Sequence, residues 1–335
     1  MLGMIVRMDK SGLGVQSRRL CRMLKPDKIM LIDSTPFNGN EQHPHWYEGY
    51  ETMNIIGFPT DDQIREFVDG ISHVLTAESF YNNNFIRLAR LLDTKTIQIY
   101  NYEFWDNLRN PFLEVADKLI QPSHWMKQEM IMYRSKYLPT PIFEDEFRQA
   151  RETNLKRTGK TRYLFLNGKT AAHDRAGLES LYEALELSKG DFQVVVKAQG
   201  EIKKHPDPRL TYDFSNPEEQ YKLYEGFDAM IHPRRYGGQS LPMSEALMSG
   251  LPVIMTDISP NNEVLPSYWL IPSTKTGEFM ARTTIDIYSA SPEYLAEKLD
   301  IWSITGTDLI KPIACELAKE YEAENLRGKY EELIL

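Results

Sequence analysis

The strongest chemical signal in the sequence is a glycine-rich stretch over residues 232–246, which ends close to Glu245. A strand is predicted before it and a helix over residues 243–249, so the glycines occupy a strand-to-helix turn. The backbone N–H groups of such a turn can bind phosphate oxygens, and a carboxylate in the helix can accept hydrogen bonds from both vicinal hydroxyls of a ribose. We therefore predict a nucleotide diphosphate site, with a structural turn and a solvent-exposed glutamate as the alternative. Arg235 could add a cation, but Arg234 and Arg235 could equally pair with surface carboxylates. The predicted turn comprises Gly237, Gly238, Gln239, Ser240, Leu241 and Pro242.

A second loop, residues 167–177, supplies two cations, Lys169 and Arg175, close to Gly168. The next helix is predicted to begin directly after this loop. Both side chains would then lie at its amino end, where the helix dipole also favours an anion. We predict that the two cations bind the diphosphate; two solvent-exposed surface charges are the alternative.

Near the start of the chain, residues 9–18 follow a predicted strand and contain Gly12 and Gly14. Paired glycines at a strand-to-helix turn permit a tight bend and let backbone N–H groups approach a phosphate or a sugar hydroxyl. The third glycine of a dinucleotide-binding fingerprint is missing, because Ser17 stands in its place. A purely structural turn is the alternative.

Two carboxylates in the first half follow predicted strands and could orient an acceptor hydroxyl or a sugar. These are Glu78 and Glu103, and ordinary loop carboxylates are the alternative in each case. His43 and His45 lie in residues 37–50, which we expect to form a loop carrying an exposed histidine pair.

Length and composition are those of an ordinary soluble protein of about two domains. The chain has 335 residues, a formal net charge of −9 and 41% hydrophobic residues. An acidic total weakens a partnership with nucleic acid without excluding it. Two cysteines, Cys21 and Cys315, are expected to be reduced thiols. Since no apolar run approaches the length that spans a bilayer, we expect no transmembrane segment and a cytoplasmic location.

Strand-like and helix-like segments alternate along the chain, which predicts an α/β fold with parallel sheets covered by helices. The alternation breaks between Pro139 and Lys160, so we predict two doubly wound Rossmann-like domains facing a central cleft, over residues 1–143 and 144–316. Residues 310–335 have the spacing of an amphipathic helix, and we expect the part over 317–335 to pack back on the first domain.

The run from Pro233 to Pro266 resembles the nucleotide-sugar signature of retaining GT-B glycosyltransferases of the glycogen-synthase and sucrose-synthase-like class, the family 4 type. Its Arg-Arg-Tyr-Gly-Gly variant is similar to a group common in bacteriophage genomes. The resemblance implies a GT-B fold and transfer of a sugar from a nucleotide-sugar donor, preferably a UDP-sugar, without a metal or other cofactor. The absence of an Asp-x-Asp pair agrees with metal independence.

The resemblance also assigns roles to individual residues. It implies that Glu245 binds the donor ribose, that Lys169 and Arg175 bind the diphosphate, and that the turn over residues 240–242 meets the phosphates. The loop of Gly12 and Gly14 would close over donor and acceptor. One departure concerns position 237, where many members carry a second glutamate that contacts the donor sugar. A glycine stands there, so the sugar is not specified.

The acceptor also stays open at this point. A phage-type enzyme could act on a hydroxymethylated base in DNA within the host cytoplasm, on a virion protein, or on a glycan. Binding to DNA requires a local basic strip, which a helix with Arg18, Arg19, Arg22 and Lys25 could supply; a solvated helix face is the alternative. Two other functions are a sugar-nucleotide epimerase and a non-catalytic protein that binds nucleotide sugars.

Overall fold

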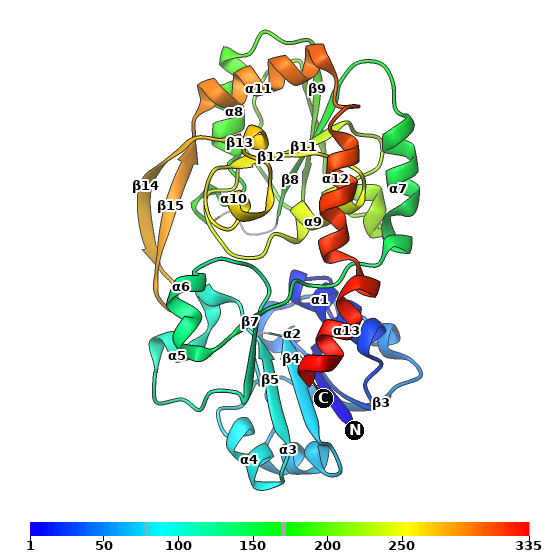
Figure 1. Ribbon diagram of the computed structural model, residues 1–335, viewed down its shortest axis with the longest axis vertical. Coiled ribbons are helices and arrows are strands. Elements are labelled where there is room, and N and C mark those ends of the chain that lie inside the picture. The colour runs from blue at the N-terminus through cyan, green and yellow to red at the C-terminus, as the bar shows by residue number, and fades with distance from the viewer. Residues whose placement is uncertain (78, 169–171, 335) are drawn as a thin grey trace. The chain divides into compact units, whose positions relative to one another are not determined.

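The computed structural model describes the whole chain except residues 78, 169–171 and 335 (Figure 1). The chain forms two compact units. Unit 1 comprises Met1–Pro141, Ala281–Thr283 and Ala323–Leu335, and unit 2 comprises Ile142–Met280 and Thr284–Glu322. Among the described residues, no helix combines the length and the apolar character needed to cross a membrane.

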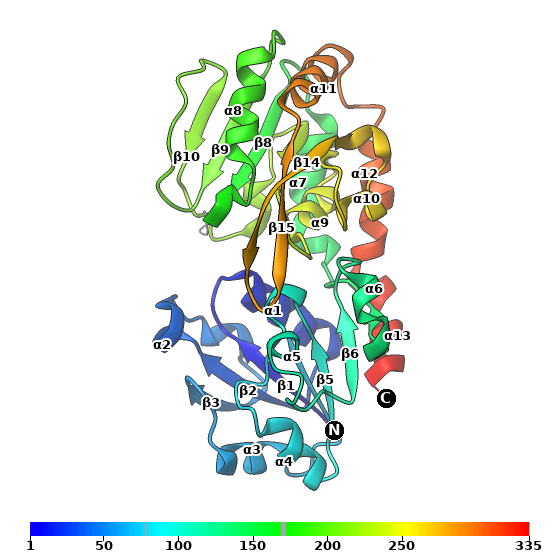
Figure 2. The same ribbon diagram turned by 90° about the vertical axis from the view of Figure 1, so that its left-hand side faces the viewer.

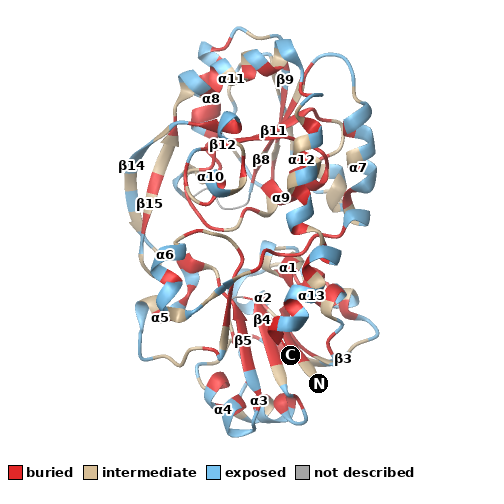
Figure 3. Ribbon diagram, in the orientation of Figure 1, coloured by how far each residue is buried: buried red, intermediate tan, exposed pale blue. Residues whose placement is uncertain are grey.

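Unit 1 is built on a parallel sheet with the strand order β3-β2-β1-β4-β5-β6-β7. Its central strands are short apolar runs buried along most of their length (Figure 3), as expected for parallel strands covered on both faces. The order reverses between β1 and β4, and the crevice at such a point is where open α/β sheets bind ligands. The strands are β1 (Leu2–Arg7), β2 (Lys28–Asp33), β3 (Glu51–Ile56), β4 (His73–Ala77), β5 (Lys95–Ile99), β6 (Lys118–Gln121) and β7 (Lys136–Tyr137).

The first helix of unit 1, α1 (Gly12–Leu24), begins where the side chain of Ser11 accepts a hydrogen bond from the amide of Gly14. It ends at Lys25, which adopts the left-handed conformation. The last helix of the chain, α13 (Ala323–Ile334), packs against α1, and its Tyr330 is buried. The remaining helices of this unit are α2 (Thr35–Asn38), α3 (Asp61–Val68), α4 (Phe85–Leu91), α5 (Asp106–Arg109) and α6 (Lys127–Met130).

Unit 2 contains a second parallel sheet, with the order β10-β9-β8-β11-β12-β13, and an antiparallel hairpin, β14-β15 (Figure 2). Here the order reverses between β8 and β11. The strands are β8 (Arg162–Asn167), β9 (Gln193–Ala198), β10 (Leu210–Asp213), β11 (Ala229–His232), β12 (Val253–Thr256), β13 (Leu270–Ile271), β14 (Ser273–Met280) and β15 (Thr284–Ala290).

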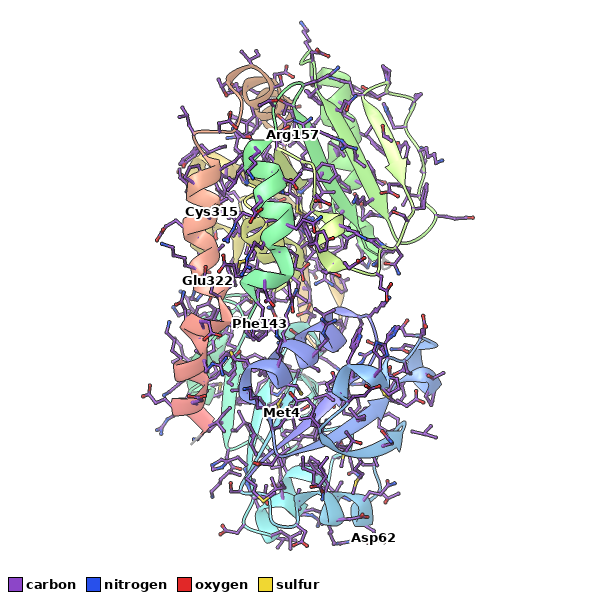
Figure 4. All side chains as sticks on the ribbon, turned by 90° about the vertical axis from the view of Figure 1, so that its right-hand side faces the viewer. Met4, Asp62, Phe143, Arg157, Cys315 and Glu322 are labelled. Carbon is purple, nitrogen blue, oxygen red and sulfur yellow. The ribbon has the colours of Figure 1, made fainter. Side chains whose placement is uncertain are left out.

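The helices of unit 2 form two groups. Helix α8 (Leu178–Leu187) packs with α11 (Pro292–Thr305), whereas α9 (Leu241–Met248) packs with α7 (Glu144–Lys156) and α12 (Lys311–Ala318). Phe143 and Arg157 flank α7, and Cys315 lies on α12 (Figure 4). A short helix, α10 (Asn261–Val264), follows β12.

Two sequence-based expectations about elements are wrong. The segment after Pro139, where the alternation was expected to break, contains α7, because a stripe of Phe147, Ala150 and Asn154 is enough to bury one face of an otherwise charged helix. The C-terminal segment is not one amphipathic helix: α12 and α13 are separate helices, because the backbone becomes extended at Glu322 between them.

Candidate functional site

Two loops of unit 2 follow the neighbouring strands β8 and β11, where the order of the sheet reverses. They are packed directly against each other. At Gly177 the backbone has φ +77°, and a Cβ atom there would lie 2.2 Å from the carbonyl oxygen of Pro233. The amide of Arg235 donates to the carbonyl of Arg175 at 3.1 Å. The chain therefore brings together the two segments in which the diphosphate-binding residues were predicted.

Arg235, for which a diphosphate contact and a surface ion pair were both left open, is hydrogen-bonded within unit 2. Its guanidinium donates to the carbonyls of Tyr288 at 2.9 Å and His173 at 3.1 Å, and to the hydroxyl of Thr276 at 3.0 Å. These partners belong to the hairpin β14-β15 and to the loop after β8. These hydrogen bonds connect the loops after β8 and β11 to the hairpin.

Arg175 and Arg234 approach each other beside Gly237. A Cβ atom built on Gly237 would lie 2.3 Å from Nη2 of Arg234 and 2.6 Å from Nη2 of Arg175. The distance between these two nitrogens therefore cannot exceed the sum of the two values. Arg234 is only 4% exposed and donates to the carbonyl of Gly238 at 3.1 Å, while Arg175 lies over the ring of Tyr236. Two guanidiniums this close, one buried and one half-buried, concentrate positive charge beside Gly237.

His232 ends strand β11 next to this pair and is itself buried. Burial, together with the charges of Arg234 and Arg175, lowers the pKa of His232 to about 3. The imidazole is therefore neutral at neutral pH. Its Nδ1 atom makes no hydrogen bond to the residues that the structure describes.

The turn that leads into α9 is capped by Ser240, whose side chain accepts from the amide of Met243. Within the described residues, no protein acceptor is recorded for the backbone N–H groups of 238–241, and the side-chain nitrogen of Gln239 also has no hydrogen-bond partner. The resemblance implied that the turn over residues 240–242 meets the phosphates, but Pro242 has no N–H group to donate. Its ring instead restricts the backbone in the first turn of α9.

Glu245 lies on α9 and is 2% exposed. One of its carboxylate oxygens, Oε2, accepts hydrogen bonds from the hydroxyl of Tyr224 at 2.6 Å and from the side chain of Gln220 at 3.1 Å. The carboxylate is thus held in place by side chains of the segment that precedes β11, rather than exposed as the alternative interpretation had it.

The head of α8 differs from the prediction. Asp174 accepts hydrogen bonds from the amides of Leu178 at 2.9 Å and Glu179 at 3.0 Å, so an acidic side chain already occupies the amino end of this helix. Burial raises the pKa of Asp174, partly offset by these two backbone hydrogen bonds. The amino end of α8 is thus capped by Asp174, and Arg175 lies in the loop before it. Gly168 is exposed directly after β8, and Lys169 lies outside the described residues.

At the corresponding edge of unit 1, the turn of Gly12 and Gly14 is fitted tightly against the end of β1. A Cβ atom on Gly14 would lie 1.8 Å from the carbonyl oxygen of Asp9. The side chain of Asp9 is fully buried and accepts from the amide of Ser11 at 3.0 Å and the hydroxyl of Ser34 at 2.8 Å. Asp9 was not among the predicted site residues, although an aspartate at the start of a glycine-containing turn is a usable signal.

The other candidates of unit 1 have mixed outcomes. Glu103 is 7% exposed in a short 3₁₀ helix after β5, and Glu78 lies outside the described residues. His45 is exposed as expected, but His43 is buried and stacks on Trp46. Of the four basic residues on α1 and at its C-cap, Arg18, Arg22 and Lys25 are exposed and Arg19 is buried.

No protein-family model matches the chain, and no curated protein sequence matches it either. Solved structures do. A glycosyltransferase from Rickettsia africae has a TM-score of 0.70 at 15% identity, over 99% of this chain and 97% of that one. Sucrose-phosphate synthase from Thermosynechococcus elongatus has a TM-score of 0.68 at 13% identity, over 99% and 97%. Anabaena HepE in complex with UDP has a TM-score of 0.66 at 11% identity, over 99% and 98%.

Likeness at such low identity concerns the fold. Each unit of this chain has a doubly wound parallel sheet, in the strand order given above, and the similarity to these structures extends over nearly the whole chain. The chain therefore has the GT-B fold, with two Rossmann-like domains.

Proposed function

We propose that this protein is a glycosyltransferase of the family 4 type, which transfers a sugar from a UDP-sugar to an acceptor hydroxyl with retention of configuration. The observation that carries the proposal is the pair of Arg175 and Arg234 beside the amide-lined turn before α9, at the reversal of strand order in unit 2. Structures of Anabaena HepE similar to this chain contain UDP or UDP-glucose, which supports a uridine nucleotide donor.

The reaction would require stabilisation of the leaving group. As the glycosidic bond to the diphosphate breaks, the sugar acquires oxocarbenium character and the phosphate oxygens gain negative charge. Arg175, Lys169 and the backbone N–H groups of 238–241 are the proposed donors to those oxygens. Because removal of one such donor typically lowers kcat by about 10²-fold or more, Arg175→Ala should show a loss of that size.

The ribose is assigned to Glu245. Its carboxylate is fixed by Tyr224 and Gln220 on one oxygen, and a carboxylate fixed in this way can accept hydrogen bonds from two vicinal hydroxyls. Glu245→Ala should therefore raise the KM for the donor more than it lowers kcat.

The acceptor is assigned to unit 1, where the loop of Gly12 and Gly14 and the carboxylates Glu78 and Glu103 follow strands of one sheet edge. Three exposed cations on α1 and at its C-cap favour an anionic acceptor, so DNA with hydroxymethylated bases, as in a phage-type enzyme, is the first acceptor to test. A virion protein and a glycan are the other two candidate acceptors. Transfer of labelled sugar to one of the three would identify it as the acceptor.

Metal ions are not expected to take part, because the cations proposed for the diphosphate are supplied by side chains. Activity should be the same with and without EDTA. A loss of activity in EDTA that Mg²⁺ or Mn²⁺ restores would contradict this part of the proposal.

A panel of nucleotide sugars, incubated with these acceptors, tests the whole proposal through the nucleoside diphosphate released. Arg175→Ala, Lys169→Ala and Glu245→Ala are compared with the wild type, and Arg148→Ala, an exposed arginine on α7, is the control. We expect transfer by the wild type and the control. Nucleotide binding without turnover in every protein would indicate the non-catalytic alternative, and an altered donor sugar without transfer would indicate an epimerase.

A further inference from the structure

Three aromatic rings, which we call the aromatic platform, meet at the carboxyl edge of the sheet in unit 1. Phe37, Phe58 and Tyr81 come from the loops after β2, β3 and β4 respectively. The ring centre of Phe37 lies 4.9 Å from that of Phe58 and 6.4 Å from that of Tyr81. Phe37 is 42% exposed and Phe58 is 66% exposed. A single exposed apolar side chain is ordinary, but rings gathered from three loops mark a binding surface.

Hydrogen bonds between the three loops hold the platform together. The amide of Gly57 donates to the carbonyl of Asp33 at 3.0 Å, which joins the loop after β3 to the end of β2. The side chain of Asn82 donates to the carbonyl of Pro59 at 2.9 Å, which joins the loop after β4 to the loop after β3. Tyr81 has a φ of +59°, a conformation that is uncommon for an aromatic residue and persists where the surrounding structure fixes it. The loops that carry the rings are therefore positioned before a ligand binds.

The platform adjoins the point where the strand order of unit 1 reverses. Asn38 follows Phe37 in α2, and its side chain donates to the carboxylate of Asp9 at 3.1 Å and to the hydroxyl of Ser34 at 3.2 Å. Asp9 is fully buried just beyond the end of β1, one of the two strands at the reversal. Open α/β sheets bind ligands at this point, so the rings stand where a substrate of unit 1 is expected.

The composition of the three loops limits what the platform can bind. In the sequence, residues 34–42, 57–60 and 78–84 contain no Lys, Arg or His, and their carboxylates are Glu41 and Glu78. DNA and anionic lipid surfaces are bound through cations, and the exposed cations of α1 lie outside these loops. The loops are instead rich in amide side chains, namely Asn38, Asn40, Gln42, Asn82, Asn83 and Asn84. This combination favours an uncharged ligand with many hydroxyls.

A sugar ring has the matching chemistry. One face of a pyranose ring carries C–H groups, which pack against the electron-rich face of an aromatic ring. The hydroxyls lie around the edge of the sugar, and an amide side chain can both donate hydrogen bonds to them and accept hydrogen bonds from them. Phe58, the more exposed of the two phenylalanines, offers the larger free ring surface for such a contact.

We propose that Phe37, Phe58 and Tyr81 bind a pyranose ring of an uncharged glycan, and that this glycan is the acceptor of the sugar transfer. The acceptor role rests on the proposed function, whereas binding of the glycan to the platform does not.

Binding of neutral oligosaccharides to the full chain, without a donor, tests the platform. The probes are trisaccharides of glucose, galactose, mannose and N-acetylglucosamine, titrated by calorimetry, with a single-stranded oligothymidylate as the anionic probe. We expect the wild type to bind at least one trisaccharide, and Phe37→Ala and Phe58→Ala each to weaken that binding at least about 10-fold. Binding of none of the trisaccharides would overturn the proposal. So would binding of the oligothymidylate that both variants weaken, because the platform would then serve a nucleic acid.

Two further variants separate the loss of a ring from a general effect on unit 1. Phe58→Tyr keeps an aromatic ring and should bind the trisaccharide within about 3-fold of the wild type. Phe112→Ala removes a phenylalanine that is 95% exposed between α5 and β6, and should bind like the wild type. Thermal unfolding identifies variants that do not fold. If Phe37→Ala is one of them, Phe58→Ala decides, and trisaccharide affinity equal to that of the wild type overturns the platform.

Failure of the platform and failure of the proposed function give different results. A wild type that releases UDP with a glycan acceptor, at a KM for that acceptor that Phe58→Ala leaves unchanged, overturns the platform only. A wild type that binds a trisaccharide through Phe58 but releases UDP with no acceptor overturns the proposed function, and with it the acceptor role, while the binding of glycan to the platform stands.

Discussion

At the end of β1, a single buried carboxylate organises the turn that precedes α1. Asp9 is fully buried and accepts hydrogen bonds from Ser11, Ser34 and Asn38, and it also pairs with Arg7. Burial by itself raises the pKa of Asp9, but the hydrogen bonds and the charge of Arg7 outweigh it and hold the pKa well below the ordinary value. The ionised form therefore stabilises the fold.

This depressed pKa predicts a specific pH dependence. Because the pKa is lower in the folded than in the unfolded chain, the stabilisation is present above the unfolded pKa of about 4 and is lost as the pH falls towards the folded value. Asp9→Asn should lower the free energy of unfolding by about 2–4 kcal/mol at pH 7, measured by urea denaturation, and by less at about pH 3. An equal loss at both pH values would contradict this role of the charge.

Tyr224 is a positioning residue for Glu245 through its 2.6 Å hydrogen bond. Tyr224→Phe keeps the buried ring and removes only the hydroxyl, so we expect the KM for the donor to rise about 3- to 10-fold with a smaller change in kcat. Steady-state kinetics at varied donor concentration test this. A higher acceptor concentration should restore neither parameter. An unchanged KM for the donor would show that the Tyr224 hydroxyl does not act on the proposed donor site.

At the scale of elements, buried apolar segments were the most predictable. Strand β11 lies directly before the glycine-rich stretch, as predicted, and like β12 it is a fully buried run of four residues. The hairpin β14-β15 was not predicted: β14 is largely exposed and carries few apolar residues, and β15, which is more buried, has only this strand as its partner. Helix α7 was missed for the same reason: its buried stripe is too narrow to give a clear period.

The turn into α1 has no room for a side chain at Gly14. Gly14→Ala should destabilise the protein by about 2–4 kcal/mol, because a methyl group would overlap the carbonyl oxygen of Asp9. Gly200→Ala is a matched control, since a Cβ atom there meets nothing within 4 Å. Denaturation midpoints that change equally in both variants would contradict the close approach seen at Gly14.

For the whole molecule, the sequence predicted the class of fold and two loops that the structure packs against each other, but not how the arginines of these loops are arranged. Arg234 and Arg235 are neighbours of the same type, and only the three-dimensional structure shows that one lies beside Arg175 while the other binds carbonyls of the hairpin. Composition and spacing cannot separate them, because the partners come from segments 41–62 residues away along the chain.

The C-terminal segment of the chain returns from unit 2 to unit 1. Residues 323–335 belong to unit 1, where Tyr330 is buried and donates to the carbonyl of Pro139 at 3.0 Å. Tyr330→Ala should destabilise unit 1 by about 3–5 kcal/mol, seen as faster hydrogen exchange in β1, β4 and α1. Exchange in the sheet of unit 2 should be unaffected, and Tyr294→Ala, at an exposed position on α11, serves as the control. Uniformly faster exchange in both units would contradict this assignment.

Release of UDP from a UDP-sugar in the presence of an acceptor is the most direct test of the central claim, that the positive site of unit 2 holds the leaving diphosphate during sugar transfer. We predict UDP release that depends on acceptor, falls about 100-fold or more in Arg175→Gln and is unchanged in Arg148→Gln. Equal rates of release by Arg175→Gln and the wild type, with donor saturating in both, would contradict the claim.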